Sequence, residues 1–153
     1  MQLRVRSLII LAVATASAGC GNDTPTSPSS PTDTTPVTVT ERFDAIVDVK
    51  GLNSYNFSVS RSGAATTVNL ASLAPLDRPG LVDVNMQIGI GTTVLDDAQN
   101  VIGCELRKTI DTRPGLTAQL SDTLTAATNY CATIADIGNL KESVNFSIRV
   151  SHP

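Results

Sequence analysis

The chain has 153 residues, 41% of them hydrophobic, and its 11 basic and 14 acidic side chains give a formal net charge of −3 at pH 7. A mildly acidic chain with scattered basic residues gives no indication of nucleic-acid binding, because phosphates require clustered lysines and arginines. A single histidine and three cysteines leave little material for histidine-based catalysis or for zinc sites.

The N-terminus has the pattern of an export signal. Arg4 and Arg6 precede a short apolar run, residues 8–19, which ends in small residues immediately before Cys20. This run is about a dozen residues long, whereas a helix that spans a membrane needs about 20. We therefore expect residues 1–19 to be a cleaved signal peptide.

Small residues that end on a cysteine resemble a bacterial lipobox. The resemblance implies that Cys20 becomes the lipidated, palmitate-bearing first residue of a mature protein that is anchored to a membrane without spanning it. Lipoboxes usually carry Leu where this chain has Ser17, and ordinary signal cleavage after Ala18 is the alternative. We expect an exported lipoprotein of the cell envelope, and Gly21 after the cysteine favours the outer membrane or the cell surface.

Residues 20–40 comprise the lipidation site, Cys20, and the tract of Thr, Ser and Pro that follows it. The tract holds almost no apolar side chain, so burial cannot offset the entropy of ordering it. Its prolines favour an extended polyproline II conformation. The tract is therefore predicted to be a disordered tether that lifts the following domain off the membrane.

Residues 41–153 are long enough for one domain with a single core. Apolar and polar residues alternate along most of it, with a period of two that is typical of strands with one buried face. Repeated short strands without a long helical pattern predict an all-β domain, an antiparallel sandwich or barrel. The alternating runs are residues 43–49, 55–59, 64–70, 82–90, 116–124, 130–134 and 144–150.

Glycine, proline and small polar residues separate these runs and predict turns. One segment, residues 122–129, has the composition of a single helical turn. The expected breaks are turns at 50–53, 61–63 and 136–139, a turn at Gly89–Gly91, and a longer loop that contains Pro75, Pro79 and Gly80.

Cys104 and Cys131 remain if Cys20 is lipidated, and in an exported protein such a pair is expected to form a disulfide. Closing a loop of 27 residues contributes about 3–4 kcal/mol in the chain-entropy model. A reactive thiol or a metal ligand is the alternative, but no CxxC spacing or nearby histidine supports it. Cys131 alternates with Tyr130 and Ala132, so the disulfide is expected on an outer face or an edge, where it pins a loop around Cys104.

The order of several motifs resembles the bacterial pre-peptidase C-terminal domain. The resemblance covers about residues 41–151 and implies a jelly-roll-like β-sandwich. Members of this family usually follow secreted proteases or other exported enzymes and act as accessory or binding modules, whereas here a tether and a lipid site precede the domain. The motifs are Gly51-Leu52, the Tyr-x-Phe-x-Val of residues 55–59, the aromatic strand that runs from Tyr130 into Asp136-Ile137-Gly138, and the Phe-x-Ile-x-Val of residues 146–150.

Some relatives in that family bind calcium, so the resemblance also implies candidate oxygen ligands. No ligand motif selects among the aspartates of this chain, and we expect neither a metal nor another cofactor to be required. The candidate ligands are Asp83, Asp96, Asp97 and Asp136.

Residues that could perform catalysis are few. His152 lies next to the C-terminus, where we expect a solvated tail residue and no general base. We therefore expect a noncatalytic module that binds a protein or a glycan, or that serves a structural role. The alternatives are an accessory subunit of a secreted or surface hydrolase, and a hydrolase that uses Asp96 and Asp97 as paired acids.

Overall fold

The computed structural model describes residues 37–126 and 128–153, which belong to one compact unit, Thr35–Pro153. The predicted signal peptide, the lipidation of Cys20 and most of the predicted tether lie outside the described residues. The tether boundary at residue 40 is wrong by two residues, because Val39 and Thr40 already pair with the last strand. Along the described part of the chain, no helix is long and apolar enough to cross a membrane.

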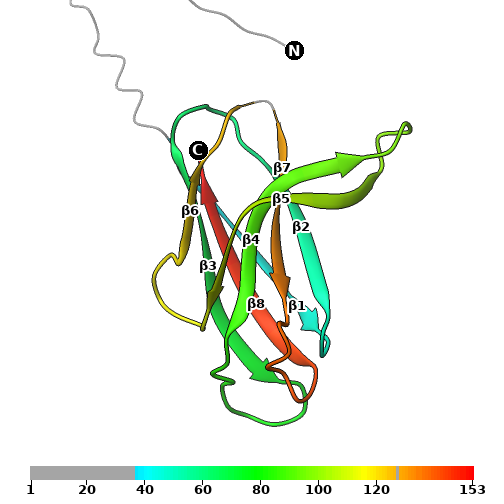
Figure 1. The fold of residues 1–153 in the computed structure, drawn as a ribbon. Helices are drawn as coiled ribbons and strands as arrows, with labels where there is room; N and C mark the ends of the chain where they lie inside the picture. The colour runs from blue at the N-terminus through cyan, green and yellow to red at the C-terminus, as the bar shows by residue number, and fades with distance from the viewer. Residues whose placement is uncertain (1–36, 127) are drawn as a thin grey trace, which may run out of the picture. The chain divides into compact units, whose positions relative to one another are not determined.

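Eight strands make up the unit (Figure 1). They alternate with loops and turns, and no helix occurs among the described residues. The described residues of 122–129 do not form the expected helical turn, because Asp122 and Thr123 belong to β6 and Asn129 begins β7. The strands are β1 (Val39–Val47), β2 (Leu52–Ser58), β3 (Ala65–Pro75), β4 (Met86–Leu95), β5 (Val101–Thr112), β6 (Leu120–Thr123), β7 (Asn129–Ala135) and β8 (Val144–His152).

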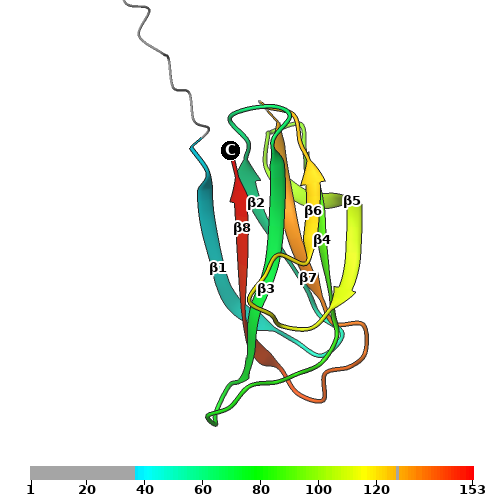
Figure 2. The ribbon, with the colours of Figure 1, turned by 90° about the vertical axis from the view of Figure 1, so that its left-hand side faces the viewer.

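The strands form two four-stranded antiparallel sheets packed face to face. One sheet has the order β1-β8-β3-β6 and the other the order β2-β7-β4-β5. Figure 2 looks onto the first sheet, with the second behind it. The ladders β1·β8, β2·β7, β3·β6 and β4·β5 pair the chain as one long ribbon wrapped into two layers, which is a jelly roll. The predicted jelly-roll-like β-sandwich is confirmed.

The core lies between the sheets and follows the predicted alternation. Inward side chains of the four central strands, β3, β4, β7 and β8, are fully buried. Two predicted core residues are wrong: Val49 is 42% exposed in the turn after β1, and Leu116 is fully exposed. The largest buried side chains include Leu70, Leu73, Met86, Ile88, Ile90, Tyr130, Ile134, Phe146 and Ile148.

β5 has no counterpart among the predicted strands, and Cys104, expected in a loop, lies within it. β5 is an edge strand with most of its residues exposed, and Arg107 is an extra residue in its ladder with β4, between Leu106 and Lys108. Such a bulge shifts the side-chain alternation by one, so no period of two runs along the strand. The predicted turn at Gly89–Gly91 is also wrong, because both glycines lie inside β4.

The two ends of the sandwich differ. At one end, which we call the proximal end, β1 begins and β8 finishes, with Val39 opposite His152. At the other, which we call the loop end, Val144 pairs with both Val47 and Pro75, so the 76–85 and 136–143 loops meet there (Figure 1). Pro75 is thus the last residue of β3 and not part of the loop that follows.

A hairpin arm leaves the body near the proximal end. We define the arm as residues 92–105, the outer halves of β4 and β5 with their connecting turn. The register shifts at Ile90/Gly91 and again at Val94/Leu95, and the arm bends away from the sandwich (Figure 1).

Candidate binding site

A pocket of about 300 Å³ opens at the loop end, between the 76–85 and 136–143 loops. Its buried and half-buried lining is aliphatic and consists of Val82, Val84, Leu140 and Val144. Val82 and Val84 lie outside any strand, yet they pack against the core. We call this hollow the loop-end pocket; its volume lies at the lower limit of ordinary ligand sites.

A second apolar hollow of about 210 Å³ adjoins the pocket, and we call it the Leu116 groove. Leu81 and Val82 line both hollows, so the two form one surface divided by a leucine–valine ridge. Leu81 is 82% exposed and Leu116 is fully exposed. Two neighbouring leucines in contact with water contribute nothing to folding, and adjoining exposed apolar side chains are typical of interaction surfaces.

Two polar side chains hold the loop that presents Leu116. Asn69 donates to the carbonyl oxygens of Gly115 at 2.8 Å and Thr117 at 2.6 Å. The side-chain oxygen of Gln119 accepts the backbone N–H of Leu70 at 2.7 Å. Together with two backbone bonds to β3, these side chains hold residues 113–119 outside any regular strand. The parity that placed Leu116 in the core therefore does not apply, and its side chain is exposed to solvent.

The exposed lining of the loop-end pocket carries charge. Arg78 donates to both carboxylate oxygens of Glu142, and this contact raises the pKa of the guanidinium. Lys141 also lines the pocket, and no carboxylate of the described residues lies within ion-pair distance of it. Asp77 lies beside Arg78 but does not line the hollow. The lining therefore holds two cations against one carboxylate.

Asp136 organises the loops of this end. One carboxylate oxygen accepts the backbone N–H groups of Gly138, Asn139 and Leu140 at 2.8–3.1 Å, and the other accepts that of Lys50 at 2.8 Å. Burial alone raises the pKa of this carboxyl, but the four N–H donors outweigh burial and hold the pKa below its usual value. The carboxylate thus joins the turn after β1 to the turn after β7.

The four candidate calcium ligands are not brought together. Asp136 is occupied by backbone donors, and Asp83 pairs with Arg113 at 3.2 Å. Asp96 closes the turn of the arm by accepting the N–H groups of Ala98 and Asn100, and the side chain of Asn100 lowers its pKa further. Across residues 37–126 and 128–153, no group of three or more His, Cys, Asp or Glu side chains is arranged to hold a metal ion. Exposed Asp97 follows Asp96 in the same turn.

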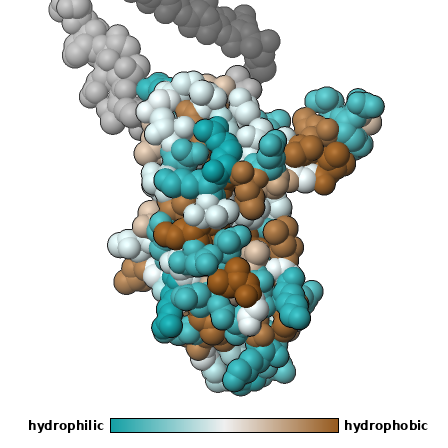
Figure 3. Space-filling view, viewed as in Figure 1, coloured by the Kyte–Doolittle hydropathy of each residue, from teal (hydrophilic) through white to brown (hydrophobic). Residues whose placement is uncertain are grey.

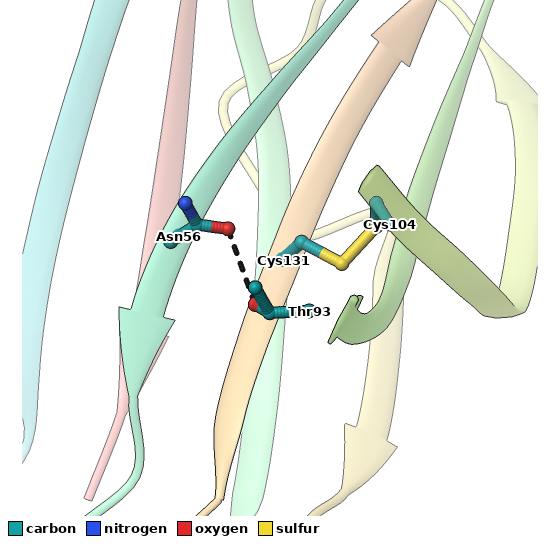
Figure 4. Close-up of a disulfide and its surroundings, with 4 residues drawn as sticks. All are labelled: Asn56, Thr93, Cys104 and Cys131. Atoms are coloured by element: carbon teal, nitrogen blue, oxygen red, sulfur yellow. Dashed lines mark hydrogen bonds between the residues drawn. A yellow bond between two sulfur atoms is a disulfide. The ribbon is translucent and has the colours of Figure 1, made fainter. Parts of the chain in front are cut away.

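Besides the ladder pairing of Thr92 with Tyr130, two side-chain contacts fix the arm to the body (Figure 4). Cys104 and Cys131 form a disulfide with a Cα–Cα distance of 5.9 Å, which confirms the predicted pairing. Beside it, the hydroxyl of Thr93 donates to the side-chain oxygen of Asn56 on β2 at 3.1 Å. Cys131 points away from the core, as its parity predicts, and it is fully buried even there. The partner, Cys104, lies in a strand and not in the expected loop.

Gly91 allows this crossing. A Cβ atom at Gly91 would lie 2.2 Å from the carbonyl oxygen of Glu105 and 2.9 Å from the sulfur of Cys104. The backbone of β5 therefore passes over β4 at a residue that has no side chain to obstruct it.

The arm carries apolar side chains that are partly exposed to solvent. Val94 is 37% exposed, Val101 50% and Ile102 64%. Figure 3 shows this apolar patch on the projecting arm, with hydrophilic residues at its tip. An isolated two-stranded ribbon is at best marginally stable in water, so the disulfide at its base is what keeps the arm in place.

His152 is not the solvated tail residue that the sequence predicts. It is the last residue of β8, 4% exposed, with its Nε2 atom 2.9 Å from a carboxylate oxygen of Glu41. Its ring lies 5.2 Å from that of Phe57. The C-terminus is tied down because β8 runs between β1 and β3, and the histidine is enclosed as part of the core wall.

Neither the comparison with protein-family models nor the search of curated proteins finds a match for this sequence. The resemblance to the pre-peptidase C-terminal domain therefore remains a prediction beyond its fold, and the function is argued from the geometry of the surface.

Proposed function

We propose that this protein is a noncatalytic lipoprotein of the cell envelope whose jelly roll binds a partner protein through its loop end. One observation carries the proposal: Leu81 and Leu116 are 82% and 100% exposed around two adjoining apolar hollows. Aliphatic anchors beside pockets are what the buried centre of a protein interface requires.

The direction of the chain supports this role. The chain enters the sandwich at Val39 on the proximal end, and the two hollows open at or toward the opposite end. A lipid on Cys20 would therefore attach the domain by the end that lies farther from Leu81 and Leu116. The binding surface is then free to meet a partner.

A glycan ligand is the second candidate, and the aromatic side chains make it less favoured. Phe57, Tyr130 and Phe146 are buried, while Phe43 and Tyr55 stack on each other at 4.8 Å between the sheets. These are all the aromatic residues of the chain, so no fully exposed ring offers a sugar a stacking surface. A surface or secreted hydrolase that uses this domain as an accessory subunit fits the proposal as one kind of protein partner.

Catalysis by Asp96 and Asp97 has little geometric support. Both oxygens of Asp96 accept hydrogen bonds within its own turn, and Asp97 is exposed at the tip of the arm. A general acid requires a shielded carboxyl with a raised pKa, whereas the pKa of Asp96 is lowered.

The test is capture from an envelope extract with immobilised residues 35–153, a segment that contains the whole compact unit and its disulfide. Leu81→Asp combined with Leu116→Asp should reduce retention of the partner protein at least about tenfold, because both changes place a carboxylate in an apolar contact. Val39→Asp is the matched control, because Val39 is 45% exposed at the proximal end.

A glycan array probed with the same three proteins separates the two candidates. Glycan binding that survives the double substitution would favour the glycan hypothesis. It would also show that Leu81 and Leu116 do not form the binding surface. No binding in either assay would favour a structural role.

A further inference from the structure

The arm is the largest feature of the described chain that neither the fold nor the proposed function uses. The exposed apolar surface of Val94, Val101 and Ile102 does not stabilise an isolated molecule, because it remains in water. The disulfide between Cys104 and Cys131 holds these side chains away from the body. A rigid projecting ribbon with uncovered apolar side chains is prepared for contact, because little conformational entropy remains to be lost when it binds.

The charge of the arm restricts what it can contact. Asp96, Asp97 and Glu105 are its charged residues, and residues 92–105 include no lysine or arginine. An anionic lipid surface would repel these carboxylates. The complementary surface is an apolar hollow with an excess of cations.

The loop-end pocket has that composition. Aliphatic side chains form its inner lining, and Arg78 and Lys141 outnumber Glu142 among its charged residues. Lys141 has no carboxylate partner among the described residues, and Asp97 forms no ion pair there. Each surface therefore offers an unpaired charge that is opposite in sign to the unpaired charge of the other.

The arm and the pocket cannot meet within one chain. The arm begins at Thr92, which pairs with Tyr130 near the proximal end (Figure 1). The pocket lies at the loop end, where Val144 is part of its lining. The disulfide prevents the arm from turning back along the sandwich. A contact between these surfaces must therefore join two molecules.

We propose that the arm of one molecule binds in the loop-end pocket of a second copy, with Ile102 against the aliphatic lining and Asp97 near Lys141. This inference rests on the proposed function, because it names a second copy as an occupant of the same pocket. The contact is heterologous: every molecule presents one arm and one pocket, and association proceeds head to tail.

The experiment is light scattering and analytical ultracentrifugation of residues 35–153 from about 10 µM to about 1 mM, the range in which small interfaces associate. The average mass should rise with concentration and fall when salt is added. Ile102→Asp and Leu81→Asp should each weaken association at least about tenfold. Val39→Asp should leave it unchanged, and circular dichroism checks the fold of each variant.

Mixing the two variants gives the decisive result. Ile102→Asp keeps an intact pocket and Leu81→Asp an intact arm, so the mixture should form one-to-one dimers that grow no further. Asp97→Lys, an exposed change at the tip of the arm, is a second arm variant and should also weaken association.

A chain that stays monomeric over the whole range would overturn the inference. So would self-association that survives Leu81→Asp, or a mixture that does not pair, because arm-to-arm contact predicts both. Capture of an envelope protein through Leu81 by a strictly monomeric chain would leave the proposed function standing without the second copy.

Discussion

At the scale of single residues, Asp136 has a structural role that the sequence did not indicate. The family resemblance offered it only as one of four candidate calcium ligands without a ligand motif, whereas in the structure four backbone N–H groups occupy both of its oxygens. Because Asp136 is 8% exposed, these bonds form in a poorly solvated environment where a missing acceptor is costly. The residue therefore stabilises the loop end.

We expect Asp136→Asn to lower the free energy of unfolding by about 2 kcal/mol near neutral pH, because an amide supplies one acceptor where the carboxylate supplies two. The lowered pKa gives the pH dependence: the contribution is complete above the pKa of an unfolded aspartate, about 3.9, and is lost as the pH falls through it toward the lower folded value. Urea unfolding of both proteins at about pH 7 and about pH 3 tests this.

The difference in stability between wild type and Asp136→Asn should shrink at the lower pH. Asp97→Asn provides the matched control, since Asp97 is exposed in the turn of the arm. An Asp136 variant as stable as the wild type at neutral pH would contradict the assigned role.

At the scale of elements, the crossing of β5 over β4 determines where the arm lies. Gly91 and the disulfide act together there, because the strand can approach closely only over a residue without a side chain. Leu106 then covers Gly89, where a Cβ atom would lie 2.8 Å from its side chain. Two glycines that indicated a turn in the sequence are thus the contact surface of an edge strand.

Gly91→Ala should destabilise the domain by about 1–3 kcal/mol and move the arm, because its Cβ would lie 2.2 Å from a backbone oxygen that cannot rotate away. Thermal unfolding gives the stability, and hydrogen exchange of residues 92–105 reports on the arm.

Gly103→Ala is the matched control in the same arm, because the atom nearest to a Cβ at this position would be 3.9 Å away. It should be neutral or slightly stabilising. Equal losses of stability in the two variants would show that the crossing places no special demand on Gly91.

At the scale of the whole molecule, the jelly roll places the start of β1 and the loop-end pocket at opposite ends. The pocket is held away from a membrane only if the chain is anchored through its N-terminal segment. Lipidation of Cys20 is a prediction from the sequence, and it decides whether the pocket is presented from a membrane.

Mass spectrometry of protein isolated from host membranes should find a mature N-terminus at Cys20 that carries acyl chains, with Cys104 and Cys131 joined. Cys20→Ser should release the protein from the membrane fraction, since the anchor is the only apolar attachment we propose. An intact Met1, or an unmodified N-terminal Gly19, would rule out the anchor.

Much of the fold could be predicted from the sequence, because most strands turn one apolar face to the core and their residues therefore alternate. Phe57, Ile88, Ile134 and Ile148 all lie in the core, as their period of two predicts. The cysteine pair was predicted equally well, since few residues compete as partners. β5 could not be predicted, because an edge strand with a bulge at Arg107 has no buried face to impose a pattern.

The candidate site could not be found from the sequence for a related reason. Leu116 shares the parity of predicted core residues, and only the loop held by Asn69 and Gln119 turns its side chain toward solvent. Leu81 lies in the loop after β3, where the backbone N–H of Val82 donates to the carbonyl oxygen of Leu73. An isolated leucine beside Pro79 and Gly80 is the one local indication, and it is too common to identify a surface.

By itself, the sequence determined the β-sandwich class, most of its core and the pairing of its cysteines, because burial and oxidation depend on residue type and spacing. Only the tertiary structure decided that His152 is enclosed, that the arm crosses at Gly91 and that two leucines meet beside a pocket. These features depend on contacts between residues far apart in the chain, and no local pattern records such contacts.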